Sequence, residues 1–283
     1  FAAINPSPVN QTIKRKIGGR HIATACKEYL RPVSPNLGPM IRRRLRLRSV
    51  AVYPSSLERA AWSSLNRLAA ASMRLHLACT SALAMRASSA SKRVRLQPID
   101  VFDDHFAILW QRCRDRYVCA VERTPTYLTW KYGSQPGRIY RTCAAFVDGD
   151  MVAYTIYRVT LDSRTGRTSM TIADQIHAGG QAGALRAILV RLLTFATKAG
   201  MEFVRIATSD PEQVRLLNWL GFVAIRQRYP IVGVPGDHKL AEQLVHGNWM
   251  LSRGDHDCDQ PQPEELEDIE TIHELDTYLR AYR

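Results

Sequence analysis

Two side chains near the middle of the sequence, Asp174 and His177, are able to accept a proton, because carboxylates and imidazoles are common general bases. Asp174 lies in a β-rich run in which Met170, Ile172, Asp174 and Ile176 alternate onto one face, so we expect it to be partly buried. His177 follows in the adjoining loop. Each has a structural alternative: Asp174 caps the next turn or pairs with an arginine, and His177 is exposed or hydrogen-bonded.

The stretch after His177 is suited to binding an anion. The turn from Ala178 to Gly183 contains three glycines and opens the clearest helix of the sequence, whose apolar residues from Leu185 to Ala196 repeat at helical spacing and which ends at Gly200. Backbone N–H groups at the start of a helix, together with the helix dipole, favour a phosphate. The alternative is an ordinary strand-to-helix turn with a glycine-rich entry.

Helices and strands alternate between residues 96 and 254. The expected helices lie at 103–117, from Thr124-Pro125 to about 132, at 185–200 and from Asp210-Pro211 to Gly221, and the expected strands at 141–147, 151–159, 169–176, 202–208, 222–234 and 248–252. Asp148-Gly149-Asp150 joins the first two strands as a hairpin. This order predicts an α/β fold with a mixed, mostly antiparallel sheet flanked by helices on both faces.

The order and several short motifs resemble the GNAT (N-acetyltransferase) superfamily over roughly 160 residues. The most telling stretch runs from Asp210 to Phe222, because Leu220-Gly221-Phe222 matches the ending of the family's last core helix. The stretches 124–132 and 249–257 look like a bacterial branch of the family. Pro8 and Gly18 repeat Pro211 and Gly221 at one spacing, so residues 1–34 are expected to be the C-terminal remnant of a first GNAT-like lobe, truncated at Phe1, as in tandem GNAT and FemAB-related proteins.

The resemblance implies a cytoplasmic N-acyltransferase that moves an acyl group, expected to be acetyl, from acyl-CoA to an amine of a small molecule or amino sugar. It implies Asp174 as catalytic base, with His177 as the other candidate. It places the acetyl-CoA or other acyl-CoA pyrophosphate on a set of turn and helix-start residues: Gln175, Ile176, Gly179, Gly180, Gln181, Ala182, Gly183 and Ala184. The acceptor groove falls at Tyr127, Trp130 and Tyr132, although core packing explains Trp130 equally well.

Two features depart from the family pattern. The spacing of Gln181 and Gly183 differs from the family's phosphate-binding motif, and Leu217 stands where the family commonly has a tyrosine that protonates the leaving thiolate. Two alternatives therefore stay open. One is a FemAB-like aminoacyl-tRNA-dependent transferase, and the other is a catalytically silent GNAT-like binding or scaffold module.

Charge and composition limit the remaining classes. The net charge is +13, with a basic run at residues 41–48 inside an expected connector (35–95) and an acidic tail at 255–283. No helix-turn-helix, RRM or zinc-finger pattern accompanies the basic run, so nucleic-acid binding is expected only in the tRNA alternative. Six cysteines without a CxxC pair predict free thiols and no metal. Asp255 is expected to be solvated, to pair with an arginine, or to grip a cationic acceptor.

Overall fold

The computed structural model describes residues 2–3, 19–21, 26–34, 71–72, 75, 78–79, 82, 94–134, 138–162, 167–228, 231–233, 238–255 and 266–268. The predicted repeat at 8–18, the basic run at 41–48 and most of the acidic tail lie outside these residues. In the part of the chain that is described, no helix is long and apolar enough to cross a membrane.

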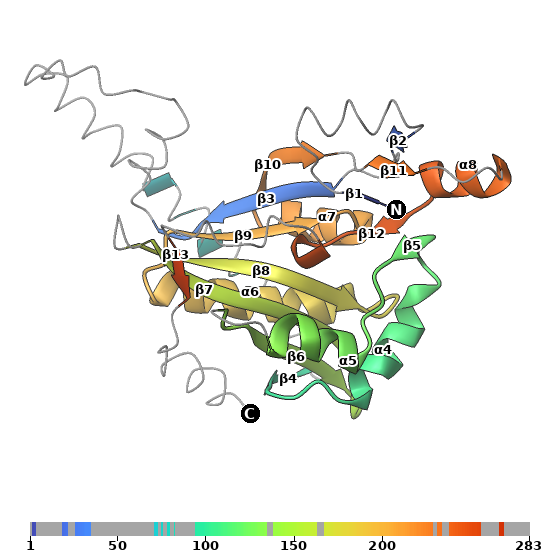
Figure 1. Cartoon of the computed structure of the whole chain (residues 1–283). Helices are drawn as coiled ribbons and strands as arrows, with labels where there is room; N and C mark the ends of the chain where they lie inside the picture. Colours follow the sequence, from blue (N-terminus) through green and yellow to red (C-terminus); the bar gives the residue numbers. More distant parts are fainter. Residues whose placement is uncertain are drawn as a thin grey trace, which may run out of the picture.

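An eight-stranded sheet forms the centre of the molecule (Figure 1). Its order is β10 (Val223–Arg228), β3 (Cys26–Pro32), β9 (Phe203–Thr208), β8 (Arg167–His177), β7 (Asp150–Asp162), β6 (Arg141–Val147) and β4 (Val94–Ile99), with β13 (Leu266–Asp268) also pairing β7. Every pair is antiparallel except β8 with β9. The predicted mixed, mostly antiparallel sheet is therefore confirmed.

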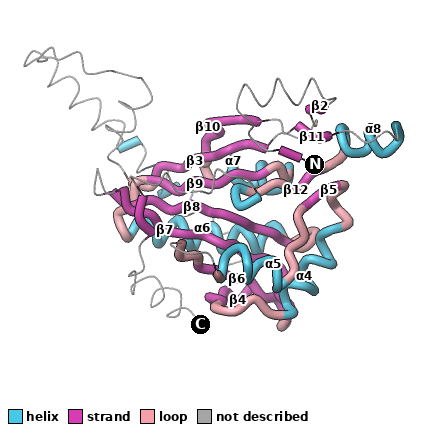
Figure 2. Tube along the Cα trace, in the orientation of Figure 1, coloured by secondary structure: helices cyan, strands magenta, loops and turns pink. Residues whose placement is uncertain are grey.

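Helices cover both faces of this sheet, as predicted (Figure 2). On one face α6 (Ala182–Lys198) and α7 (Pro211–Trp219) bury Leu185, Ile188 and Leu217 against the strands. On the other face lie α4 (Asp104–Arg114), α5 (Pro125–Leu128) and a π-helix (Thr129–Gly133). The central sheet is therefore covered by an apolar layer on each face.

Local signals set most helix ends. The side chains of Asp103, Thr124 and Asp210 accept hydrogen bonds from the first-turn amides of α4, α5 and α7, and proline follows the last two. Gly221 ends α7 with a φ of 79°, a conformation that a residue without Cβ adopts at little cost. The predicted starts of α4, α5 and α7 are confirmed to within a residue.

Several elements were missed or misassigned from the sequence. Strand β4 precedes the first predicted helix, and α8 (His238–His246) lies between the strands predicted at 222–234 and 248–252. The strand expected at 222–234 is split into β10 and β11 (Ile231–Gly233), and β11 pairs with β1 (Ala2–Ala3) and β2 (Gly19–His21) in a separate sheet. The strand expected at 248–252 is only β12 (Trp249–Met250), which pairs in parallel with β5 (Cys119–Ala120).

The expectation that Met170, Ile172, Asp174 and Ile176 share one face is wrong. Across β7, Ile172 lies opposite Tyr157 and Asp174 opposite Ile156, so Ala173 is an extra residue in β8. Such a bulge reverses the side-chain alternation beyond it. Met170 and Ile172 pack in the core under α6, whereas Ile176 packs in the core under α4. Asp174 faces the α4 side as well, toward Tyr154.

Candidate active site

Strands β8 and β9 diverge at the centre of the sheet. They pair only from Met170 to Ile172 and from Val204 to Ile206, although β8 continues to His177 and β9 to Thr208. Helix α6 starts at Ala182 and α7 at Pro211, directly after the two strands end. Both helix N-termini, with their partial positive charge, therefore lie at the opening between the strands.

Buried polar side chains fill the opening on the side of α7. Gln175 Nε2 donates to Gln213 Oε1 (2.9 Å), and Gln213 Nε2 donates to the Gln175 carbonyl (3.3 Å). Thr208 Oγ1 accepts from the Asp210 amide (3.1 Å) and donates to Gln213 Oε1 (2.7 Å). These hydrogen bonds form one connected network, in which each donor group faces an acceptor. The network holds β8, β9 and α7 together.

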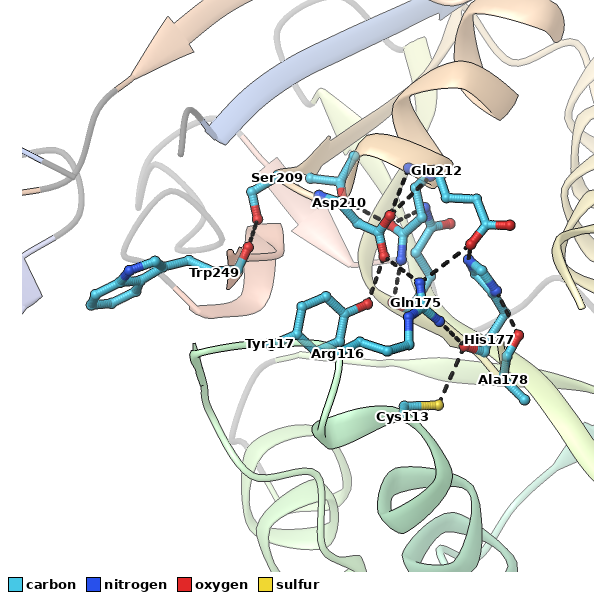
Figure 3. Close-up of polar contacts among 12 residues, drawn as sticks. Cys113, Arg116, Tyr117, Gln175, His177, Ala178, Ser209, Asp210, Glu212 and Trp249 are labelled. Atoms are coloured by element: carbon cyan, nitrogen blue, oxygen red, sulfur yellow. Dashed lines mark hydrogen bonds and ion pairs between the residues drawn. The ribbon is translucent and has the colours of Figure 1, made fainter. Parts of the chain in front are cut away.

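At the mouth of the opening, one arginine meets two carboxylates (Figure 3). Arg116 Nη2 lies 3.2 Å from Asp210 Oδ2 and 3.3 Å from Glu212 Oε2, and Nη1 donates to the His177 carbonyl (2.9 Å). Tyr117 Oη also donates to Asp210 Oδ2 (2.5 Å), and its pKa is raised by burial and by that carboxylate. The side chain of Glu212 is 32% exposed, so this cluster is reached from solvent.

His177 lies against this cluster and is only 1% exposed. Its Nδ1 lies 2.9 Å from the Ala178 carbonyl, and its Nε2 lies 3.7 Å from Glu212 Oε2. A carbonyl only accepts, so Nδ1 carries the hydrogen. The structure thus places the predicted His177 beside Glu212, which was not expected from the sequence.

Asp174, the other predicted base, lies in a second buried cluster on the α4 side. Its two oxygens lie 3.3 Å from Arg123 Nη2 and Nε, and Tyr154 Oη donates to Oδ2 (3.0 Å). Arg123 Nη2 also donates to Asp255 Oδ2 (2.7 Å), which accepts from the Ser252 amide (2.8 Å). Asp174 and Arg123 are each 1% exposed, so the Asp174 carboxylate is enclosed.

Electrostatics in this second cluster follow from burial. Burial raises the pKa of Asp255, more than Arg123 lowers it. Burial opposes the charge of Arg123, yet the two carboxylates hold its pKa above the ordinary value. Burial raises the pKa of Tyr127 to about 12. The predicted arginine partner for Asp255 is therefore present, and it is Arg123.

The predicted phosphate-binding turn is open. No side chain caps α6, and Gly179 and Gly180 are exposed. A Cβ added at Gly179, Gly180 or Gly183 would meet nothing within 4 Å. An anion therefore has room at the first amides of α6. The other predicted residues of this stretch differ, because Gln175 and Ile176 are buried in β8 and the side chain of Gln175 faces Gln213.

Of the three aromatic residues predicted to shape an acceptor groove, Tyr127 and Trp130 lie against each other, with ring centroids 5.8 Å apart, and Tyr132 is enclosed. Tyr132 is buried in the core under α4, and Tyr127 is partly buried beside it. Trp130 is 60% exposed and lines an open hollow of about 500 Å³. The other residues of that hollow are Phe102, Pro125, Thr126, Thr129 and Ser134. Trp130 and the partly exposed Tyr127 therefore reach solvent, whereas Tyr132 does not.

Similarities to known proteins are found among solved structures, whereas no family model and no curated protein matches. The GCN5-related N-acetyltransferase from Anabaena variabilis is 11% identical, with 95% of this chain and 57% of that chain covered and a TM-score of 0.48. A tandem GNAT protein from the clavulanic acid biosynthesis pathway is 12% identical (84% and 64% covered, TM-score 0.39). The Saccharomyces cerevisiae N-myristoyltransferase with bound myristoyl-CoA is 9% identical (80% and 57% covered, TM-score 0.42).

These neighbours carry GNAT or acyltransferase names. The chain spans 57% of the length of the Anabaena protein, and none of the three TM-scores reaches 0.5.

Sequence reasoning missed Arg116, Arg123 and Glu212. Asp210 was recognised only as a helix cap, although its second oxygen also binds Arg116 and Tyr117. The signal that was present is the position of Glu212 in the first turn of a helix that starts beside the opening. The two arginines had no local signal, because their carboxylate partners Asp174, Asp210 and Asp255 lie 51 to 132 residues away along the chain.

Proposed function

We propose that this chain contains an acyl-CoA-dependent acyltransferase lobe of GNAT type. The observation that carries the proposal is the uncapped, open N-terminus of α6 at the point where β8 and β9 diverge. Amides at a helix start favour phosphate oxygens, so the first residues of α6 with Gly179 and Gly180 would hold the pyrophosphate of the donor. A bound thioester supplies the activated acyl group.

For the acceptor we propose an amine on a small molecule or amino sugar. An ammonium has no lone pair, so a nearby group must first take a proton from it. Of the two predicted bases, His177 lies beside the partly exposed Glu212, whereas Asp174 is enclosed by Arg123 and Tyr154. We therefore favour His177 in this conformation and keep Asp174 as a base that requires displacement of residues 252–255.

A second candidate is a binding module without catalytic activity. The enclosed Asp174, the glutamine pair between the strands and Leu217 at the position of the family's tyrosine all favour it. The aminoacyl-tRNA-dependent alternative stays a prediction, because the basic run that would contact tRNA lies outside the described residues.

The test compares Gly183→Asp with Gly183→Asn. Both side chains have room, but only aspartate places a negative charge in the first turn of α6, where it suits the helix dipole and repels phosphate. We expect acetyl-CoA to raise the unfolding temperature of the wild-type chain and of the asparagine variant, and to leave the aspartate variant unchanged. Calorimetry with acetyl-CoA and with adenosine as control provides the measurement.

Equal stabilisation of all three proteins by acetyl-CoA would contradict a pyrophosphate site at α6. If acetyl-CoA binds as expected, acetyl-CoA hydrolysis or transfer to glucosamine distinguishes the enzyme from the silent module. Complete absence of turnover across a panel of amines, with intact binding, would favour the module.

A further inference from the structure

The gap between β8 and β9 is filled, on the α4 side of the sheet, by the segment 252–255. Ser252 forms an antiparallel bridge to Thr208, the last residue of β9. Two residues later, a Cβ added at Gly254 would lie 3.2 Å from the carbonyl of Ala173 in β8. The segment ends as a 3-10 helix that contacts both strands. It therefore spans the two strands at the point where they no longer pair with each other.

The same segment covers the carboxylate of Asp174. Asp255 accepts a hydrogen bond from Arg123 Nη2 (2.7 Å), and the same guanidinium lies 3.3 Å from each oxygen of Asp174. Burial raises the pKa of Asp255 more than Arg123 lowers it, so an ionised Asp255 is favoured in water over its buried position. When Asp255 leaves, Arg123 still pairs with Asp174, so no buried arginine is stranded without a counter-ion.

The three residues before this segment are firmly anchored. Trp249, Met250 and Leu251 are at most 5% exposed and lie in two apolar clusters. Ser209 Oγ donates to the Trp249 carbonyl (2.5 Å), as Figure 3 shows, and accepts from the Leu251 amide (2.8 Å). Movement of the chain is therefore expected to begin after Leu251.

Residues 252–255 themselves are held only by polar contacts. Their sequence, Ser-Arg-Gly-Asp, contains no apolar side chain, so displacing them exposes little apolar surface. Arg253 Nη1 donates to Glu28 Oε1 (2.8 Å), and the side chain of Glu28 is 18% exposed, so this contact lies near solvent. Segments with few buried apolar contacts open locally at a lower free energy than the core around them.

We propose that residues 252–255 form a plug, which swings out from the anchored residues 249–251 and opens the gap between β8 and β9 to Asp174. The closed form encloses the Asp174 carboxylate, and the open form exposes it to solvent on the α4 side. The plug is thus an autoinhibitory contact built into the fold. Its effect on acyl transfer rests on the proposed function, whereas the opening itself does not.

The opening is tested on the whole chain without acyl-CoA by labelling carboxyl groups with a carbodiimide and glycinamide, followed by peptide mass spectrometry. In the wild type we expect Asp174 and Asp255 to be labelled together. Both should react more slowly than Asp150, whose side chain is 63% exposed. Both should also react faster than the amide hydrogens of β7 exchange, because exchange in the central strands reports global unfolding.

Two variants weaken the plug at different contacts. Arg253→Gln removes the charged contact with Glu28, and Gly254→Ala places a Cβ against Tyr132 Oη. Each should raise the labelling rate of Asp174 at least about tenfold, and by more than it raises amide exchange in β7.

Each variant has a matched control. Arg167→Gln also removes an arginine–glutamate ion pair, the one that Arg167 forms with Glu202 (2.9 Å). Gly133→Ala adds a Cβ that meets only Thr129 Cγ2, at 3.6 Å. Both controls should leave the labelling rate of Asp174 unchanged, because neither residue contacts the plug.

Three results would overturn the proposal: labelling of Asp174 only as fast as exchange in β7, equal effects of the plug variants and their controls, or labelling of Asp255 while Asp174 stays protected. Absence of acetyl-CoA binding, with labelling as expected, would instead contradict only the proposed function.

Discussion

The same residue-scale arrangement occurs twice around the diverging strands: one arginine contacts two carboxylates. Arg116 meets Asp210 and Glu212 near solvent, and Arg123 meets Asp174 and Asp255 in the interior. Charges are costly to bury, and such a cluster persists only when its members pair and hydrogen-bond. The Arg116 cluster, in which Arg116 and Glu212 are partly exposed, is therefore within reach of a ligand, and the enclosed Arg123 cluster is suited to holding the fold together.

Removal of Arg123 should destabilise the protein strongly. Arg123→Leu leaves two buried carboxylates without their cation, so we expect the free energy of unfolding to fall by about 3–5 kcal/mol. Urea unfolding followed by circular dichroism measures it. Arg112→Leu is the control, because its ion pair with Asp150 is exposed and contributes about 0–1 kcal/mol. A similar loss in both variants would show that the buried cluster has no special role.

Asp255 should make stability depend on pH. Its pKa is raised in the folded protein, so its contribution to stability is present below the unfolded-state pKa and is lost as pH rises through the folded pKa. Asp255→Asn removes this ionisation. As pH rises from about 4 to 8, we expect the wild type to lose unfolding free energy relative to the variant, because only the wild type must ionise residue 255. A pH-independent difference between the two unfolding free energies would refute the assignment.

At the scale of elements, the bulge in β8 and the 3-10 helix Arg253–Asp255 fit closely against each other. A Cβ at Gly254 would clash with Tyr132 Oη and lie 3.2 Å from the Ala173 carbonyl, at the extra residue of the bulge. Only a residue without a side chain permits this approach. The approach brings Asp255 within reach of Arg123.

Gly254→Ala tests this contact between elements. We expect a loss of about 1–3 kcal/mol in unfolding free energy from overpacking, together with faster amide exchange in residues 249–255. Tyr132→Phe removes the hydroxyl, so the double variant should recover part of the loss. If the losses of the two single variants simply add in the double variant, the Tyr132 hydroxyl is not the group that excludes a side chain at position 254.

At the scale of the whole molecule, strand β3 lies in the interior of the eight-stranded sheet although it is distant in sequence from the other strands. The next strand of this sheet along the chain, β4, starts only at Val94. It pairs with β9 on one side and β10 on the other, and its Tyr29 is buried in the core under α6. Glu28 also binds Arg253 (2.8 Å). The sheet of the domain predicted at 96–254 thus includes β3, which comes from residues 1–34. The origin of residues 1–34 in a first GNAT-like lobe stays a prediction.

A fragment of residues 35–283 should therefore lack a central strand. Without β3, the edges of β9 and β10 are unpaired, and we expect aggregation or a lower unfolding temperature than that of the whole chain. A peptide of residues 24–34 added in trans should restore the temperature, and the same peptide with Tyr29→Asp should not. Size-exclusion chromatography and thermal unfolding provide the measurements. A fragment as stable as the whole chain would contradict this role of β3.

The sequence alone determined the features that depend on neighbouring residues. The start of α7 at Asp210-Pro211, its end at Gly221, the hairpin turn at Asp148-Gly149 and the length of α6 were predicted correctly. Caps, turns and helical periodicity act within a few residues, so their signals are readable in one dimension. The order of these elements predicted the mixed, mostly antiparallel sheet with helices on both faces.

Only the tertiary structure decided which distant groups meet. The bulge at Ala173 turned Asp174 away from the face expected for it and toward Arg123, 51 residues earlier in the chain. The insertion of β3 and the approach of Glu212 to His177 likewise depend on backbone paths set by the whole core. Residue type shows what a side chain is able to bind, but its partner is chosen by packing among all the elements, and that choice leaves no local pattern.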